Sequence, residues 1–189
     1  TYVLGRAYGT LLRDHGVTKA VVGRDCRLSS LAYSQAMTDG LIACGIDVVD
    51  IGLATTPVFY FSRILYGIEG GFRVTCSHNP PEFNGFKLAL GPDTLYGEGI
   101  QKIWRIVQAG NFADGKGSLS TENPVPAYVD DIAGRVKLGP HKVRVVVDCG
   151  NGAAGPVAQQ ILQRIGADFE EMYFEPDGSF PNHHPDPTH

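Results

Sequence analysis

The chain has 189 residues, enough for one large domain or two small ones. Hydrophobic residues make up 43% and charged residues 19%, which is ordinary for a globular soluble protein. The formal net charge of −4 excludes the basic field of a nucleic-acid-binding protein, and no apolar run is long enough to span a membrane. We therefore expect neither nucleic acid nor a membrane as a partner, although a few local cations and backbone amides could bind a small anion.

The four cysteines, Cys26, Cys44, Cys76 and Cys149, lack the close spacing of a metal-binding knuckle. A chain of this size does not need disulfides for stability. Because no segment is typical of a signal peptide, we expect reduced thiols in a cytoplasmic protein. The chain begins at Thr1 and stops in a polar loop, so we expect a fragment of something longer.

The first half of the chain alternates between apolar runs and helical periodicity. Ser29 and Ser30 can cap a helix, Gly45 can end it, and Pro57 fits the first turn of the next one. The predicted elements are a strand at 19–23, a helix at 30–44, a strand at 46–51, a helix at 55–66, and strands at 71–75 and 85–90. This order predicts a mostly parallel sheet with helices packed on it.

The strands at 71–75 and 85–90 are joined by about ten residues without a helix, which is too short for a parallel crossover. The strand at 85–90 is therefore expected to be antiparallel to its neighbour. The connection between them becomes a loop at one edge of the sheet.

The second half repeats the pattern less completely. Ile100, Ile103, Trp104 and Val107 share one face of a predicted helix and are expected in the core, and the Gly/Ser/Asn-rich segment 110–123 resembles an interdomain linker. Further elements are expected as a helix at 125–136, a strand at 142–148, a helix at 156–165 and a strand at 168–174. The predicted fold class is α/β: two consecutive α/β domains with mixed, mostly parallel sheets between helices, at 1–115 and 116–189, the second incomplete.

One loop, "RVTCSHNPPEFNGFKL" at 73–88, carries a possible nucleophile. Serine needs an activating base or a cation that stabilises developing charge. A Ser77–His78 dyad is disfavoured, because neighbouring side chains of an extended backbone point to opposite faces and there is no G-x-S-x-G elbow. The prolines and Asn84-Gly85 could instead hold a rigid loop that brings Lys87 near Ser77, an arrangement that suits phosphoryl transfer. The alternative is an ordinary polar surface loop.

Three other segments could bind ligands. In "GRDCRLSS" (23–30), Arg24, Arg27 and the amides of a helix start could meet an anion; the alternative is an Asp25–arginine surface ion pair and a helix cap. Gly150, Gly152 and Gly155 match the G-x-G-x-x-G pattern of an NAD-dependent oxidoreductase, with Glu170 as a candidate ribose-binding acid. The terminal group His183, His184, Asp186 and His189 could in principle bind a metal, but it lies in a Pro-rich segment, and a polar loop is the favoured interpretation.

Four segments of the chain resemble segments of the α-D-phosphohexomutase family, and they occur in the same order as in that family. "VTCSHNPPEFNGFKL" is similar to its active-serine loop, "GRDCRLSS" to its G-R-D-x-R-x-S segment, and "VVVDCGNGAAG" to the start of its second domain. "DGSFPNHHPDP" (177–187) is similar to a segment of the phosphomannomutase/phosphoglucomutase branch. The resemblance covers nearly the whole chain.

The resemblance implies an isomerase and phosphotransferase of carbohydrate metabolism that moves phosphate reversibly between C1 and C6 of a hexose phosphate. It implies a phosphoserine at Ser77, a hexose 1,6-bisphosphate intermediate, and Mg²⁺ bound at Ser77. By position, Arg24 and Lys87 would neutralise phosphoryl oxygens, and His78 would shape the site or assist proton transfer.

This sequence also departs from the family pattern at some positions and lacks several of the family's segments. Cys76 stands where the family usually has Ala or Gly, and Phe72-Arg73 where smaller or apolar residues are common. The D-G-D-G-D-R metal loop and the later domains are absent from these 189 residues. We therefore expect partners in the missing C-terminal domains of the same chain, and no turnover by this fragment alone.

Overall fold

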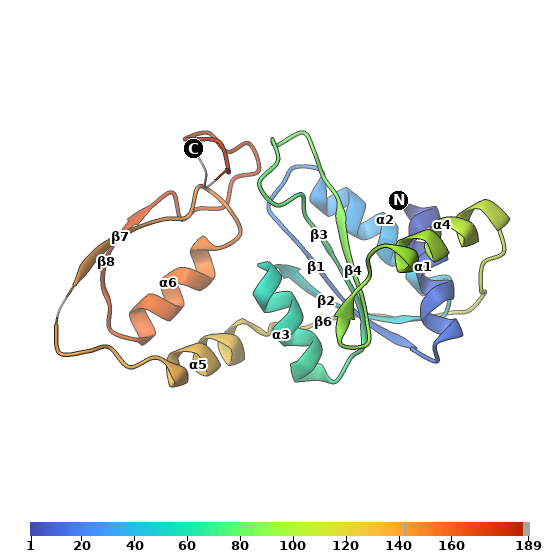
Figure 1. Ribbon diagram of the computed structural model, residues 1–189, viewed down its shortest axis with the longest axis horizontal. Helices are drawn as coiled ribbons and strands as arrows, with labels where there is room; N and C mark the ends of the chain where they lie inside the picture. Colours follow the sequence, from blue (N-terminus) through green and yellow to red (C-terminus); the bar gives the residue numbers. More distant parts are fainter. Residues whose placement is uncertain (142, 187–189) are drawn as a thin grey trace.

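The computed structural model describes residues 1–141 and 143–186. Two α/β units follow one another along the chain, the first larger than the second (Figure 1). The elements in chain order are α1 (Tyr2–Asp14), β1 (Lys19–Arg24), α2 (Ser30–Ile42), β2 (Asp47–Leu53), α3 (Thr56–Tyr66), β3 (Gly70–Val74), β4 (Phe86–Leu90), β5 (Asp93–Thr94), α4 (Glu98–Ala109), β6 (Leu119–Thr121), α5 (Val125–Arg135), β7 (Arg144–Asp148), α6 (Gly155–Arg164) and β8 (Asp168–Met172). None of these helices is long and apolar enough to cross a membrane.

The first unit contains a six-stranded sheet in the order β5-β4-β3-β1-β2-β6. The pairs β1–β2, β1–β3 and β2–β6 are parallel, whereas β3–β4 and β4–β5 are antiparallel. The prediction that the strand after the serine loop runs antiparallel is therefore confirmed. The second unit contains only the parallel pair β7–β8, and the predicted α/β class with an incomplete second domain is confirmed.

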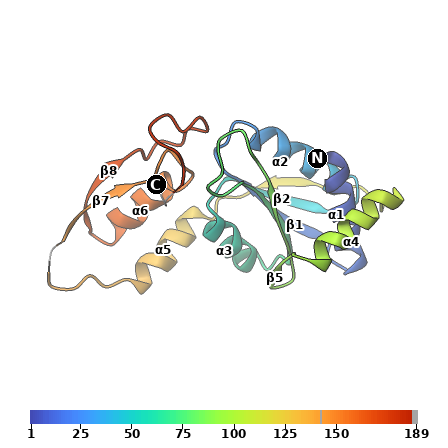
Figure 2. The same ribbon diagram turned by 45° about the horizontal axis from the view of Figure 1, so that its top comes forward.

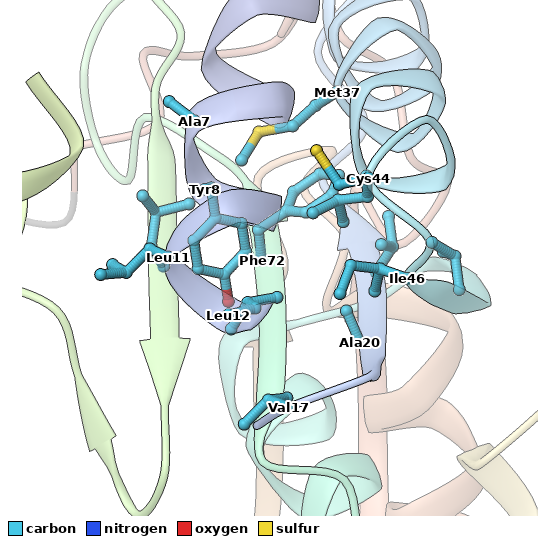
Figure 3. Close-up of a cluster of buried hydrophobic side chains, with 14 of the residues drawn as sticks. Ala7, Tyr8, Leu11, Leu12, Val17, Ala20, Met37, Cys44, Ile46 and Phe72 are labelled. Atoms are coloured by element: carbon cyan, nitrogen blue, oxygen red, sulfur yellow. The ribbon is translucent and has the colours of Figure 1, made fainter. Parts of the chain in front are cut away.

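Alternating strand residues of the first sheet enter two separate cores. Ala20 and Val22 of β1 join the cluster beneath α1 and α2, whereas Val21 joins a second cluster with Val58 and Phe59 of α3. A strand with both faces covered reads as a continuous apolar run, and this explains the composition of β1. Figure 3 shows part of the first cluster.

Helix α1 was not predicted, and it completes that first core. Tyr8 is fully buried, and its hydroxyl lies 2.8 Å from the Gly71 carbonyl oxygen and 2.6 Å from the Ala89 carbonyl oxygen, linking α1 to β3 and β4 (Figure 3). A Cβ atom added to Gly5 would lie 2.3 Å from the Met37 carbonyl oxygen on α2. Glycine on α1 therefore permits the close approach of the two helices.

The expected linker at 110–123 differs from the structure in its last part. Residues 119–121 form β6, which pairs with Val48–Asp50 of β2. The short polar sequence of β6 gives no strand signal by itself. The segment is a strand because it pairs with β2. The first sheet therefore extends beyond residue 115, and the domain boundary between 115 and 116 stays a prediction.

The predicted core role of the α4 stripe is wrong at Trp104. Ile103 is buried, but the Trp104 side chain is 55% exposed. The apolar stripe of α4 is wider than the surface with which this helix packs against the first unit. Residues at the edge of the stripe, such as Trp104, are therefore exposed to solvent. The other predicted elements begin and end within two residues of the observed ones, except that Lys142, placed in the predicted strand 142–148, lies outside the described residues.

Candidate active site

The loop between β3 and β4 presents Ser77 in a rare backbone conformation. Ser77 is exposed and has φ of +52°, in the left-handed region that a residue with a Cβ seldom adopts. Its backbone N–H donates to Thr75 Oγ1 at 3.3 Å. Strained backbone of this kind persists only where the surrounding structure enforces it.

Arg27 supplies that enforcement. Its guanidinium group is buried and donates to four carbonyl oxygens of the loop at 2.6–3.1 Å. These carbonyls belong to Ser77, Asn79, Pro80 and Phe83. One side chain from the β1–α2 connection therefore fixes both the serine and the loop around it.

Asp25 holds Arg27 in this position. The Asp25 carboxylate accepts hydrogen bonds from Arg27 Nε and the Arg27 backbone N–H, each at 3.1 Å, and from the Ser30 hydroxyl. The ion pair is buried, with side-chain exposures of 1% for Arg27 and 10% for Asp25. The surface ion pair considered for "GRDCRLSS" is thus present as a buried one.

Ser29 and Ser30 were expected as helix caps, but neither makes a side-chain capping bond to α2. Their hydroxyl oxygens each accept a hydrogen bond from Asn84 Nδ2 at 2.9 Å. Asn84 belongs to the far end of the serine loop. The two serines therefore attach that loop to the start of α2.

A cleft of about 660 Å³ separates the serine loop from the second unit. The first unit contributes Arg27, Thr56, Arg73, Ser77 and His78 to its wall, among others. The second unit contributes Asp148, Gly150, Gly152, His183 and Pro185, among others. Figures 1 and 2 show the C-terminal segment beside the loop between β3 and β4.

The C-terminal segment contacts the serine loop through His78. His78 Nδ1 lies 3.1 Å from the Pro185 carbonyl oxygen. Because a carbonyl oxygen can only accept, Nδ1 carries the hydrogen of this bond, and in the neutral imidazole the lone pair is then on Nε2. The contact therefore orients the imidazole next to Ser77.

The four residues expected at the site divide into two pairs. Ser77 and His78 line the cleft; Arg24 and Lys87 do not belong to its wall, as far as the described residues define it. Arg24 is half-buried, with Nη1 3.4 Å from the Asp25 carbonyl oxygen. Lys87 is half-buried on β4, directly across from Arg73 of β3.

Two arginines have roles that sequence reasoning missed. Arg27 was considered as an anion-binding group, but it binds the serine loop instead. Arg73 was noted only as a departure from the resembled family, and it lies buried in the cleft wall. A single arginine within an otherwise apolar strand was the available signal.

On the opposite wall, Asp148 and His183 form an ion pair. His183 Nε2 lies 3.0 Å from Asp148 Oδ2, and Nδ1 lies 2.9 Å from the His184 carbonyl oxygen. The bond to the His184 carbonyl, and then the one to Asp148, raise the pKa of His183. Within the described residues no group of three or more His, Cys, Asp or Glu could hold a metal, and His189 of the expected terminal group lies outside them.

The cleft cysteines are not activated thiols. Burial raises the pKa of Cys26 and of Cys149, which disfavours the reactive thiolate. Cys26 Sγ also donates to the Asn151 carbonyl oxygen at 3.4 Å, a contact between the two units. Ser77 is therefore the better candidate nucleophile in this cleft.

Both units match models of known protein families. The model described as "Phosphoglucomutase/phosphomannomutase, alpha/beta/alpha domain I" matches residues 1–114, and the domain II model matches residues 126–189. The chain belongs to the phosphoglucomutase/phosphomannomutase family. The family assignment confirms the resemblance drawn from the four sequence segments.

Curated relatives and solved structures of this family match almost the whole chain. It is 40% identical to a phosphoglucomutase of Neisseria gonorrhoeae over 189 residues, which are 99% of this chain and 41% of the relative. It is 39% identical to a phosphomannomutase/phosphoglucomutase of Pseudomonas aeruginosa, covering 98% of this chain and 40% of the relative. A family structure from Burkholderia thailandensis superposes with a TM-score of 0.93 at 41% identity, covering all of this chain and 43% of that one.

The chain thus spans about two fifths of the length of the curated relatives it matches. The dinucleotide-binding alternative has no support from these relatives. Gly150, Gly152 and Gly155 do join a strand to a helix, but within the segment that matches domain II of the mutase family.

Proposed function

We propose that this chain is the N-terminal part of a phosphohexomutase that moves phosphate between C1 and C6 of mannose or glucose phosphates. The observation that carries the proposal is Ser77, exposed in a strained conformation at the cleft and fixed by Arg27. Relatives named phosphoglucomutase and phosphomannomutase/phosphoglucomutase support the substrate class. The activity requires the parts of the relatives that this chain does not cover.

In the proposed reaction, Ser77 carries the phosphoryl group in the resting enzyme. A hydroxyl oxygen of the hexose monophosphate attacks the phosphorus, the bond between phosphorus and Ser77 Oγ breaks, and the proton lost by the attacking hydroxyl is balanced by one gained at Ser77 Oγ. The product is a hexose 1,6-bisphosphate. In the second half, Ser77 Oγ attacks the other phosphate, which regenerates the phosphoserine and releases the isomeric monophosphate.

We propose His78 as the group that accepts a proton, because it follows Ser77 in the chain and lines the same cleft. Its Nδ1 contacts the Pro185 carbonyl oxygen, so the Nε2 lone pair is available to the cleft. Arg24 and Lys87 remain proposed cations for the phosphoryl oxygens, and both would have to reorient to reach the cleft. Fixed positive charge is the main requirement of phosphoryl transfer, because the transition state spreads negative charge over its oxygens.

We propose Mg²⁺ at Ser77 only as a site completed by residues outside this chain. Magnesium takes six oxygen ligands, and the described residues offer no cluster of carboxylates beside Ser77. A bound magnesium ion would neutralise phosphoryl charge. The residues present do not by themselves fit the ion.

The proposal also covers organisation and location. We keep the boundary between residues 115 and 116 as the proposed domain division, with β6 returning to the first sheet. A cytoplasmic location is proposed because Cys26, Cys44, Cys76 and Cys149 are all free thiols.

Phosphopeptide mass spectrometry of the full-length protein tests the function. We expect phosphate on Ser77, no phosphate at this position in Ser77→Ala, and an unchanged signal in the matched control Ser120→Ala on β6. The 189-residue chain should show no mutase turnover above its Ser77→Ala form. Full-length protein that turns over hexose phosphates with Ser77 replaced by alanine would contradict the assignment.

A further inference from the structure

Arg73 is a buried cation in the wall of the active-site cleft. It lies on β3, where its neighbours Phe72 and Val74 enter the core on the other face of the sheet. Arg73 is 5% exposed and lines the cleft together with Thr56 and Ser77. Buried guanidinium groups are normally paired with a carboxylate, because removing an unpaired charge from water is costly.

The hydrogen-bond partners of Arg73 are neutral. Nε donates to the Ala54 carbonyl oxygen at 2.8 Å, and Nη1 donates to Thr56 Oγ1 at 3.0 Å. Nη2 makes no hydrogen bond within residues 1–141 and 143–186, and it is not sealed from solvent. Burial lowers the pKa of Arg73, the direction expected for a charge without sufficient compensation.

Asp25 is the carboxylate that interacts electrostatically with Arg73, but it is already occupied. It accepts two hydrogen bonds from Arg27 and one from Ser30. One carboxylate therefore faces two guanidinium groups, and this part of the cleft wall carries excess positive charge. On the other wall, Asp148 is paired with His183.

Two further features increase the positive potential at Arg73. Its contacts Ala54 and Thr56 lie at the N-terminus of α3, which is the positive end of the helix dipole. Lys87 lies directly opposite Arg73 on β4, so the two cations share one face of the sheet, a pairing that is destabilising between like charges.

Arg63 provides an internal contrast at the other end of the same helix. It is also buried, but it lies in the last turn of α3, where a cation is favoured, and donates to the Glu69 and Gly91 carbonyl oxygens. Arg63 does not line the cleft in the part of the chain that the structure describes. Arg63 therefore lies at the favourable end of the helix dipole and outside the cleft, whereas Arg73 lies at the unfavourable end and lines the cleft.

We propose that Arg73 Nη2 and the Thr56 hydroxyl form a binding site for a phosphate monoester dianion in the cleft. Thr56 Oγ1 accepts from Arg73, which leaves its own hydrogen to donate to the anion. A guanidinium group and a hydroxyl are suitable donors for phosphate oxygens. This inference rests on the proposed function, and the dianion is either phosphorylated Ser77 or the phosphate of the bound sugar.

Thermal unfolding of the 189-residue chain separates the two sources. In the first arm, glucose 1-phosphate is titrated into a Ser77→Ala background, alone and combined with Arg73→Met or Arg63→Met. A ligand at 100 times its Kd should raise Tm by about 5–10 °C. We expect Arg73→Met to weaken binding about 10- to 100-fold and Arg63→Met to leave it unchanged, even if both lower Tm without ligand.

In the second arm, chain phosphorylated on Ser77 is compared with phosphatase-treated chain. If the phosphoserine is the ligand, phosphorylation raises Tm in the chain with native Arg73 and in Arg63→Met, but not in Arg73→Met. If Arg73→Met has an effect only in the first arm, the ligand of the site is the phosphate of the sugar.

The proposal is overturned if Arg73→Met behaves like Arg63→Met in both arms. Its failure is distinct from that of the proposed function, which depends on phosphate at Ser77. Full-length protein with phosphoserine 77 and no Arg73 effect would retain the function and remove this site. Arg73-dependent binding of glucose 1-phosphate without any phosphoserine would do the reverse.

Discussion

Strands β3 (GGFRV) and β7 (RVVVD) both contain apolar residues but have very different surroundings. All five residues of β3 are buried, between β1 and β4 and under helices on both faces. In β7, four of five residues are exposed, and its only strand partner among the described residues is β8. An apolar run therefore shows that a strand is suited to burial, while the number of packed neighbours decides how much stability it contributes.

The largest effect is expected when the buried strand loses a side chain. Phe72→Ala should lower the free energy of unfolding by about 4 kcal/mol, because it leaves a cavity in the core beneath α1 and α2. The matched change on the exposed strand, Val146→Ala, should cost about 0.5 kcal/mol or less. Urea unfolding measures both, and equal losses would contradict the comparison.

A smaller effect is expected from Arg27→Met. The substitution leaves the Asp25 carboxylate buried without its cation and releases the carbonyls of the serine loop. Breaking a buried pair in this way costs about 3 kcal/mol. Urea unfolding measures the loss. Relative to the parent chain, amide hydrogen exchange should accelerate more in residues 75–85 than in β3. Uniform acceleration through both would mean that Arg27 supports the whole unit rather than the loop.

The smallest effect is expected in the second unit, from the Asp148–His183 pair. Because the pKa of His183 is raised by folding, its stabilisation is fully present below its unfolded pKa of about 6.5 and is lost as pH rises through the higher folded value. Tm of the parent chain should therefore exceed that of His183→Gln at pH 5.5, and the difference should shrink toward pH 8.5. A constant difference would show that the contact is not a titrating pair.

Much of this organisation follows from local sequence. The short connection between β3 and β4 predicts their antiparallel pairing, and Pro57 marks the first turn of α3. Gly45 was expected to end α2, but that helix ends earlier, at Ile42. Helix α1 escaped prediction because Gly5 and Gly9 are poor helix formers. They are favoured there only because α2 packs so closely against them.

The candidate site was less predictable than the fold. The sequence proposes Ser77 and His78 as site residues, since they stand together in an unusual Pro- and Asn-Gly-containing loop, and both line the cleft. It gives no measure of which cation faces the cleft. Arg24, Arg27 and Arg73 differ in role because of strand pairing and burial, and these depend on the tertiary structure.

The return of the chain through β6 has a consequence for the cleft. Only residues 122–124 separate β6 from α5, and three extended residues reach at most about 11 Å. So short a tether places the second unit at a high effective concentration, of millimolar order, beside the serine loop. The contact between His78 and Pro185 can therefore form without strong intrinsic affinity, and it can open without the units drifting apart.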